Sequence, residues 1–68
     1  MRKNLKMFRV QNDLSHETIS QKIGCSRATY SAIERGIREG RRAFWEDLQI
    51  AFKLSDDKMW ALMKNERP

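Results

Sequence analysis

Apolar residues recur along the chain at intervals of three and four positions, which is the spacing of an amphipathic helix. No run alternates between apolar and polar residues over the length of a strand, so we expect no β-sheet. The three glycines lie in the middle of the chain and interrupt the helical spacing. The pattern therefore predicts an all-α domain of five helices, over about residues 3–11, 15–24, 26–35, 41–52 and 55–63.

Residues at the ends of these segments support the predicted boundaries. Ser15, Ser26 and Ser55 each precede a helical segment, where a serine hydroxyl can accept a hydrogen bond from the first turn. Asn12 and Asp13 end the first segment, because both residue types tolerate the left-handed conformation of a helix terminus. The second and third segments each end at a glycine, which adopts that conformation without strain.

Each predicted helix carries one apolar stripe, so we expect a single core and a single domain over residues 1–68. The apolar face of the last helix either packs entirely into this core, or part of it remains exposed and forms a dimer interface. The expected core residues are Leu5, Phe8, Leu14, Ile19, Ile23, Tyr30, Ile33, Trp45, Leu48, Phe52, Leu54 and Trp60.

The charge balance is basic, with 14 Lys plus Arg against 9 Asp plus Glu and a formal net charge of +5. Such a chain attracts polyanions, so nucleic acid and anionic membrane are the candidate partners, beside a basic protein that binds neither. No stretch approaches the roughly 20 apolar residues of a membrane span. The segments are also too short, and too strongly patterned toward one core, for membrane-surface helices.

Composition also argues against an enzyme. Cys25 and His16 are the only residues of their types, so neither an internal disulfide nor a zinc site can form. This cysteine usage suits a reducing compartment, and we expect a cytoplasmic protein. No spacing of Ser, His and acidic residues predicts a catalytic triad, and so short a chain offers no ordinary ligand cavity. We therefore expect no catalytic residue, no metal, no cofactor and no small-molecule ligand.

The most informative stretch runs from Leu14 to Gly36. It predicts two short helices joined by a tight turn at Gly24 and Cys25, with the second helix opening at Ser26. Such a helix-turn-helix, over about residues 15–36, can hold its second helix in the major groove of DNA while the first crosses the backbone. Cys25 is expected to be a small, partly buried apolar residue of the turn.

This stretch resembles the Cro/cI-type helix-turn-helix family, also called the XRE family, of phage and bacterial repressors. The run from Leu48 to Ser55 resembles the fourth helix of that family and the cap of its fifth. The resemblance implies a five-helix fold of the lambda-repressor-like type. It further implies a Cro-like repressor that binds double-stranded DNA at a two-fold-symmetric operator as a homodimer, in solution or only on DNA. The residues that carry it are Ile19, Ile23, Gly24, Ser26, Tyr30, Ile33, Glu34 and Gly36.

The resemblance, together with the chemistry of the side chains, assigns the DNA contacts. It also implies that Arg9 and Glu34 form an ion pair between the first and third helices. The expected base-reading residues are Ser26, Arg27, Ala28, Thr29 and Ala32. The expected phosphate-binding residues are His16, Ser31, Arg35, Arg38 and Arg41.

The side chains leave several of these roles open. Arg27 can read guanine with two hydrogen bonds or can bind phosphate. Ala28 and Ala32 can only touch thymine methyl groups, which raises the share of shape readout and phosphate contact. His16 is either a phosphate contact or an ordinary surface residue. The arginines between residues 35 and 42 either bind phosphates or form a solvated loop.

A second function belongs to a different class. The same fold can serve as a protein-interaction module, such as a component of an antitoxin or antirepressor, that binds DNA weakly. The two alanines of the reading helix favour this alternative. A large exposed apolar patch on the fourth and fifth helices would be expected of it. RNA binding is a third alternative, disfavoured because no aromatic residues lie on a polar face for base stacking.

Overall fold

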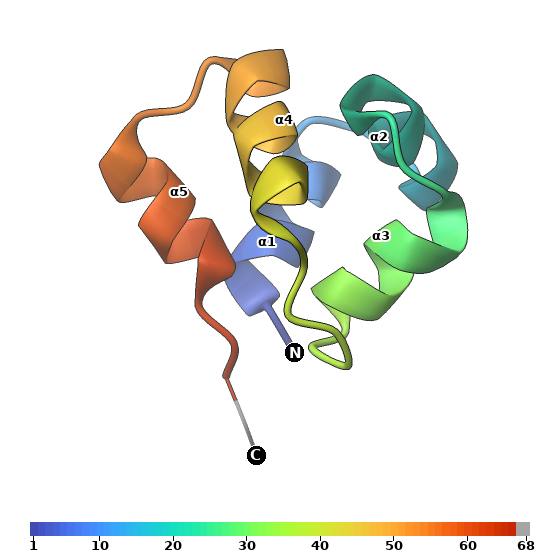
Figure 1. The fold of residues 1–68 in the computed structure, drawn as a ribbon, viewed down its shortest axis with the longest axis horizontal. Helices are drawn as coiled ribbons and strands as arrows, with labels where there is room; N and C mark the ends of the chain where they lie inside the picture. The colour runs from blue at the N-terminus through green and yellow to red at the C-terminus, as the bar shows by residue number, and fades with distance from the viewer. Residues whose placement is uncertain (67–68) are drawn as a thin grey trace.

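The computed structural model describes residues 1–66, and within them it contains five helices and no strand (Figure 1). This arrangement confirms the predicted all-α fold. The helices are α1 (Lys3–Gln11), α2 (His16–Ile23), α3 (Arg27–Glu34), α4 (Arg42–Phe52) and α5 (Asp56–Met63).

Serine side chains begin three of the helices, as predicted. The hydroxyl oxygen of Ser15 accepts a hydrogen bond from the backbone N–H of Thr18 at 3.0 Å. Ser55 caps α5 in the same way, through the N–H of Lys58 at 3.2 Å. The third cap, on α3, involves residues of the candidate DNA surface. Each cap satisfies a backbone donor that has no partner inside its helix.

Two helix ends use the left-handed conformation without a glycine. Asp13, just after α1, has a φ of 55°, and Lys53, after α4, has a φ of 53°. The backbone N–H of Leu54 then reaches back to the carbonyl oxygen of Gln49 at 3.0 Å. The chain can therefore reverse after α4 and start α5 within a few residues, at the cost of local strain at Lys53.

The core is built from residues of all five helices, and α4 lies between α5 and α2 in Figure 1. Eight of the predicted core residues are buried, and Leu14, Phe52 and Leu54 are half-buried against them. Phe44 is a core residue that was not predicted, while Met59 and Leu62 belong to the predicted apolar face of the last helix. The buried apolar residues are Leu5, Phe8, Ile19, Ile23, Tyr30, Ile33, Phe44, Trp45, Leu48, Met59 and Leu62.

The prediction that Trp60 is a core residue was wrong, because 70% of this residue is exposed. Met59 and Leu62 lie three positions apart on α5 and both face the core. Trp60 is turned by roughly 100° from Met59 around the helix axis, so it points away from the same core. Phe44 and Trp45 are both buried because α4 has neighbours on two sides, and their rings meet edge to face at 4.9 Å.

No helix within residues 1–66 combines the length and the apolar character that crossing a membrane requires.

Candidate nucleic-acid interface

The turn between α2 and α3 has the geometry that its sequence predicts. Gly24 adopts a φ of 91°, and the backbone N–H groups of Gly24 and Cys25 both donate to the carbonyl oxygen of Ser20, at 2.8 and 3.0 Å. A residue with a Cβ would meet no neighbour at Gly24, so the positive φ alone explains the glycine. The two helices, of eight residues each, pack against one another across this turn.

One face of α3 is buried and the opposite face is open. Tyr30, Ile33 and Glu34 point into the protein. Arg27 and Ala28 are exposed on the first turn of the helix. Ser31 and Ala32 are half-buried on the same outward side, and Arg35 follows, exposed, at the C-terminal end. The helix therefore presents a strip about 12 Å long to solvent, which matches the length of eight helical residues.

Two of the predicted base-reading side chains also form the cap of α3. The hydroxyl of Ser26 accepts a hydrogen bond from the backbone N–H of Thr29 at 3.1 Å and donates to the Thr29 hydroxyl oxygen at 2.8 Å. The proton of Ser26 is thus used within the protein. The hydroxyl proton of Thr29 remains available, so Thr29 can donate to DNA while the hydrogen bond between the two hydroxyl groups is kept.

The inner face of α3 is tied to α1 by the predicted ion pair. Arg9 Nε lies 2.9 Å from Glu34 Oε2, and Arg9 Nη1 donates to the carbonyl oxygen of Leu14 at 2.9 Å. Burial alone would raise the pKa of Glu34. Hydrogen bonding to Arg9 and the charges of Arg9 and His16 outweigh burial and hold the pKa of Glu34 below its usual value. The carboxylate is therefore ionised at neutral pH and fixes the orientation of α3.

His16, the first residue of α2, is turned toward this ion pair. Its Nε2 atom lies 3.3 Å from Glu34 Oε1, and its ring centroid is 5.9 Å from that of Tyr30. The side chain is half-buried as a result. Because Nε2 is engaged, only Nδ1 of the imidazole remains for the predicted contact with a phosphate.

Three of the predicted phosphate-binding arginines lie at the end of α3 and in the loop between α3 and α4. Arg35, Arg38 and Arg41 are all exposed, and Arg41 occupies the N-cap position of α4. The loop turns through Gly36 and Gly40, each with a φ of 82°. Side chains at these positions would also clash, because a Cβ at Gly36 would overlap Asn65 and one at Gly40 would lie 2.9 Å from Trp45 Nε1.

The fold and the geometry of α2 and α3 agree with a comparison against models of known families. The model of a helix-turn-helix domain matches residues 2–62. The chain belongs to this helix-turn-helix domain family. Comparisons with curated proteins and with solved structures found no match. Membership in the family indicates a DNA-binding regulator.

One residue that positions the loop of this helix-turn-helix domain was not identified from the sequence. Arg2 is only 2% exposed, and its backbone N–H donates to the carbonyl oxygen of Glu34 at 2.8 Å. Its guanidinium lies 5.4 Å from the centroid of the Trp45 ring. The same group donates to four carbonyl oxygens, those of Ile33, Arg38, Glu39 and Met63.

Arg2 therefore joins the N-terminus to the end of α3, to the end of α5 and to the loop between α3 and α4. We call this loop, residues 35–41, the arginine loop. The guanidinium of Arg2 binds the carbonyl oxygens of Arg38 and Glu39 from the interior, while the side chain of Arg38 stays exposed. Nothing in the local sequence distinguishes Arg2 from Lys3 and Lys6, which are exposed. Only the positions of its distant partners reveal its role.

The turn cysteine of the helix-turn-helix domain is half-buried and packs against the core, as expected. Burial raises the pKa of the Cys25 thiol, so the thiol stays neutral and weakly reactive. Within residues 1–66, no group of three or more His, Cys, Asp or Glu residues is arranged to hold a metal ion.

Proposed function

We propose that this protein is a sequence-preferring transcription regulator of the Cro/cI type, which inserts α3 into the major groove of double-stranded DNA and represses transcription. The observation that carries the proposal is the outward face of α3, open at Arg27 and Ala28 and followed by three exposed arginines. The major groove is about 12 Å wide and accepts a helix of this size. Since all five helices contribute to one core, we treat residues 1–68 as a single DNA-binding domain.

The side chains on this face differ in the contacts that they can make with DNA. Arg27, on the first turn, is the candidate for reading guanine, and Thr29 can donate its free hydroxyl proton to a base edge. Ala28 and Ala32 offer only methyl groups, which suit thymine. Ser26 contributes mainly by holding the first turn of the helix in place.

The proposed phosphate contacts come from α3, from the loop after it and from α2. Ser31 and Arg35 continue the outward strip of α3, and the loop adds Arg38 and Arg41. His16 begins α2, where backbone N–H groups without helical partners favour an anion. The net charge of +5 adds a long-range attraction to DNA that falls with salt.

The dimeric part of the proposal rests on the resemblance to Cro/cI-type repressors. Two copies on a two-fold-symmetric operator would place their α3 helices in successive major grooves, about 34–36 Å apart. The recognised site would then be an inverted repeat with half-sites about one helical turn apart.

A second candidate function, that of a protein-interaction module, is favoured by one observation. Ile50 on α4 and Trp60 on α5 are 74% and 70% exposed, which is unusual for large apolar side chains. Exposed apolar side chains on α4 and α5 fit a protein partner, as expected for an antitoxin or antirepressor component.

Selection of sites from random duplex DNA, at low and at physiological salt, distinguishes the two functions. Enrichment of an inverted repeat that persists at physiological salt is the result expected of a dimeric repressor. Binding that disappears with salt and enriches no sequence would contradict base readout and favour the protein-interaction function.

A further inference from the structure

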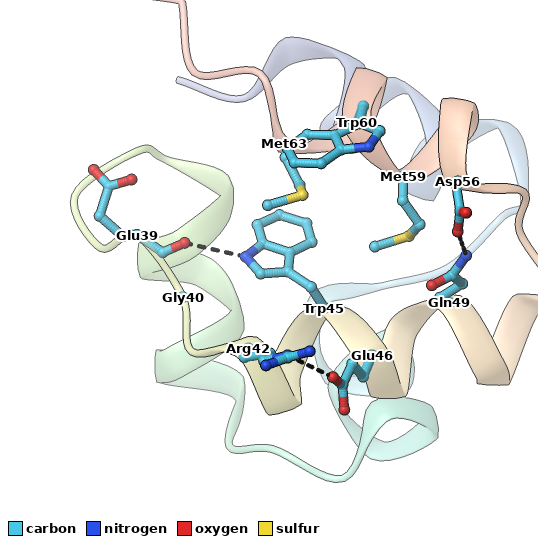
Figure 2. A pocket seen from close by; sticks show the side chains of 10 residues that line it. All are labelled: Glu39, Gly40, Arg42, Trp45, Glu46, Gln49, Asp56, Met59, Trp60 and Met63. Carbon is cyan, nitrogen blue, oxygen red and sulfur yellow. Dashed lines mark hydrogen bonds and ion pairs between the residues drawn. The ribbon is translucent and has the colours of Figure 1, made fainter.

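An apolar groove lies between α4 and α5 (Figure 2). In Figure 1, α5 lies on the side of α4 opposite to α2. The groove has a volume of about 550 Å³. Trp45, Met59, Trp60 and Met63 point toward it from the two helices. Trp60 lines the outer side of the groove and is 70% exposed, so apolar side chains of the groove remain accessible to solvent within residues 1–66.

The rim of this groove is acidic, although the whole chain is basic. Glu39, Glu46 and Asp56 lie around it, and among residues 1–66 Arg42 is the one basic residue that lines it. Two of these carboxylates already have a basic partner: Arg42 Nε lies 2.9 Å from Glu46 Oε1, and Arg2 Nη2 lies 3.5 Å from Glu39 Oε2. The groove therefore suits a surface that is apolar in the middle and positively charged around it.

The outer face of α1 has that composition. Met7 and Val10 are 55% and 53% exposed, and they lie beside Lys3 and Lys6. With Met1 and Gln11 they surround a shallow hollow of about 480 Å³, and Lys3 Nζ already lies 3.6 Å from Glu66 Oε2. Both surfaces consist of residues outside α2 and α3.

The α1 face and the groove point in different directions. On α5, Lys58 turns toward α1, with its ammonium group 5.9 Å from the centroid of the Phe8 ring. Trp60 lies two positions along the helix, roughly 200° around its axis, and turns to the other flank. A copy of the chain therefore cannot cover its own groove with its own α1.

We propose that the α1 face of one copy packs into the α4–α5 groove of a second copy, in a head-to-tail contact. Met7 and Val10 meet Trp60 and the methionines, while Lys6 faces the acidic rim. A symmetric contact of groove with groove would instead bring two acidic rims together, which costs energy. Because the joined surfaces differ, each added copy leaves one α1 face and one groove free, and the contact can repeat.

This contact goes beyond the proposed function and does not depend on DNA. It leaves the outward face of α3 free, since no residue of α2 or α3 takes part. The two surfaces are small compared with the roughly 800 Å² per partner of a stable interface, so the contact is weak in solution. On DNA, it adds a favourable interaction between copies bound at neighbouring sites.

Sedimentation equilibrium of the purified chain, over a concentration series without DNA, tests the contact. We expect the weight-average mass to rise above the 8.1 kDa of one chain as concentration increases. Met7→Asp disables the α1 face and Trp60→Asp disables the groove, so each variant alone stays monomeric. Mixed in equal amounts, the two variants have one intact pair of surfaces, so we expect them to form a one-to-one pair that does not grow further.

Ile37→Asp is the matched control, because Ile37 is 67% exposed and belongs to neither surface. This variant should associate like the unsubstituted chain. Val10→Asp and Trp60→Ser replace the first pair if circular dichroism shows that a variant has lost its helices.

Three results would overturn the proposal: a monomer at every concentration, a Met7→Asp variant that associates normally, or a mixture that stays monomeric. Failure of DNA selection leaves these measurements unaffected, so the two proposals fail independently.

Discussion

Arg9 of α1 and Glu34 of α3 form an ion pair in the interior, with 12% and 3% of their side chains exposed. Glu34 belongs to α3, the helix that we propose for base reading, while Arg9 belongs to α1, which is not part of the helix-turn-helix. His16 also contacts the same carboxylate, from the start of α2. One buried group thus aligns both helices of the helix-turn-helix with α1.

Removal of Arg9 should destabilise the protein strongly. Arg9→Met leaves the Glu34 carboxylate buried without its main partner, and we expect a loss of about 3–5 kcal/mol in the free energy of unfolding. Urea denaturation followed by circular dichroism measures this loss. The double variant Arg9→Met/Glu34→Gln removes the uncompensated charge and should recover part of it. A single variant as stable as the unsubstituted chain would show that the pair does not orient α3.

The stability should also depend on pH through Glu34. Its pKa is lower in the folded protein than in the unfolded chain, so its contribution is complete above the unfolded value of about 4.3. As pH falls through the lower folded value, the carboxylate is protonated and the contribution is lost. We expect the urea midpoint to fall between about pH 5 and pH 3, and to fall less in Glu34→Gln. Equal slopes in the two proteins would contradict this assignment.

Arg2 should be needed for both stability and DNA binding. Arg2→Met leaves four carbonyl oxygens without their donor, and we expect the free energy of unfolding to fall by about 2–4 kcal/mol. Affinity for DNA should fall as well, even at temperatures where the variant is folded, because the arginine loop loses its internal anchor. Lys3→Met, at the exposed neighbouring position, is the control and should change stability by less than about 0.5 kcal/mol.

Two arginines should differ in how their loss affects different DNA sequences. If Arg27 reads a base, Arg27→Ala should weaken binding to the preferred site by about 1–3 kcal/mol and leave random DNA less affected. Arg38→Ala should weaken binding to all sequences alike and reduce the slope of affinity against salt by about one unit. Fluorescence anisotropy with specific and random duplexes at several salt concentrations measures both effects. Uniform loss for Arg27→Ala would assign Arg27 to phosphate instead.

Lys53 offers a test of backbone strain. Its left-handed conformation is unfavourable for a residue with a Cβ, so Lys53→Gly should raise the free energy of unfolding by about 0.5–1 kcal/mol. Lys53→Ala removes the same charge but keeps the strain, and it should not stabilise the protein. Thermal unfolding at fixed pH compares the two variants. If Lys53→Ala also stabilised the protein, the gain would come from removal of the lysine charge and not from relief of backbone strain.

The sequence by itself determined the positions of the helices and of the turn. Serine caps, a glycine at the turn and apolar residues three and four apart act over a few neighbouring residues, so they can be recognised locally. The Arg9–Glu34 pair was also predicted, although only through the resemblance to a family. These local features are sufficient to predict α3 and its outward residues.

The tertiary structure alone decided which apolar residues are covered and which polar side chains are free. Met59 and Trp60 are adjacent in sequence and both apolar. Met59 is buried because it lies on the side of α5 that meets the core, and Trp60 is exposed because it lies on another side. Arg2 is buried because four carbonyl oxygens from distant segments converge on it, which no local pattern encodes. Burial depends on how helices far apart in sequence pack together, and packing is a property of the whole fold.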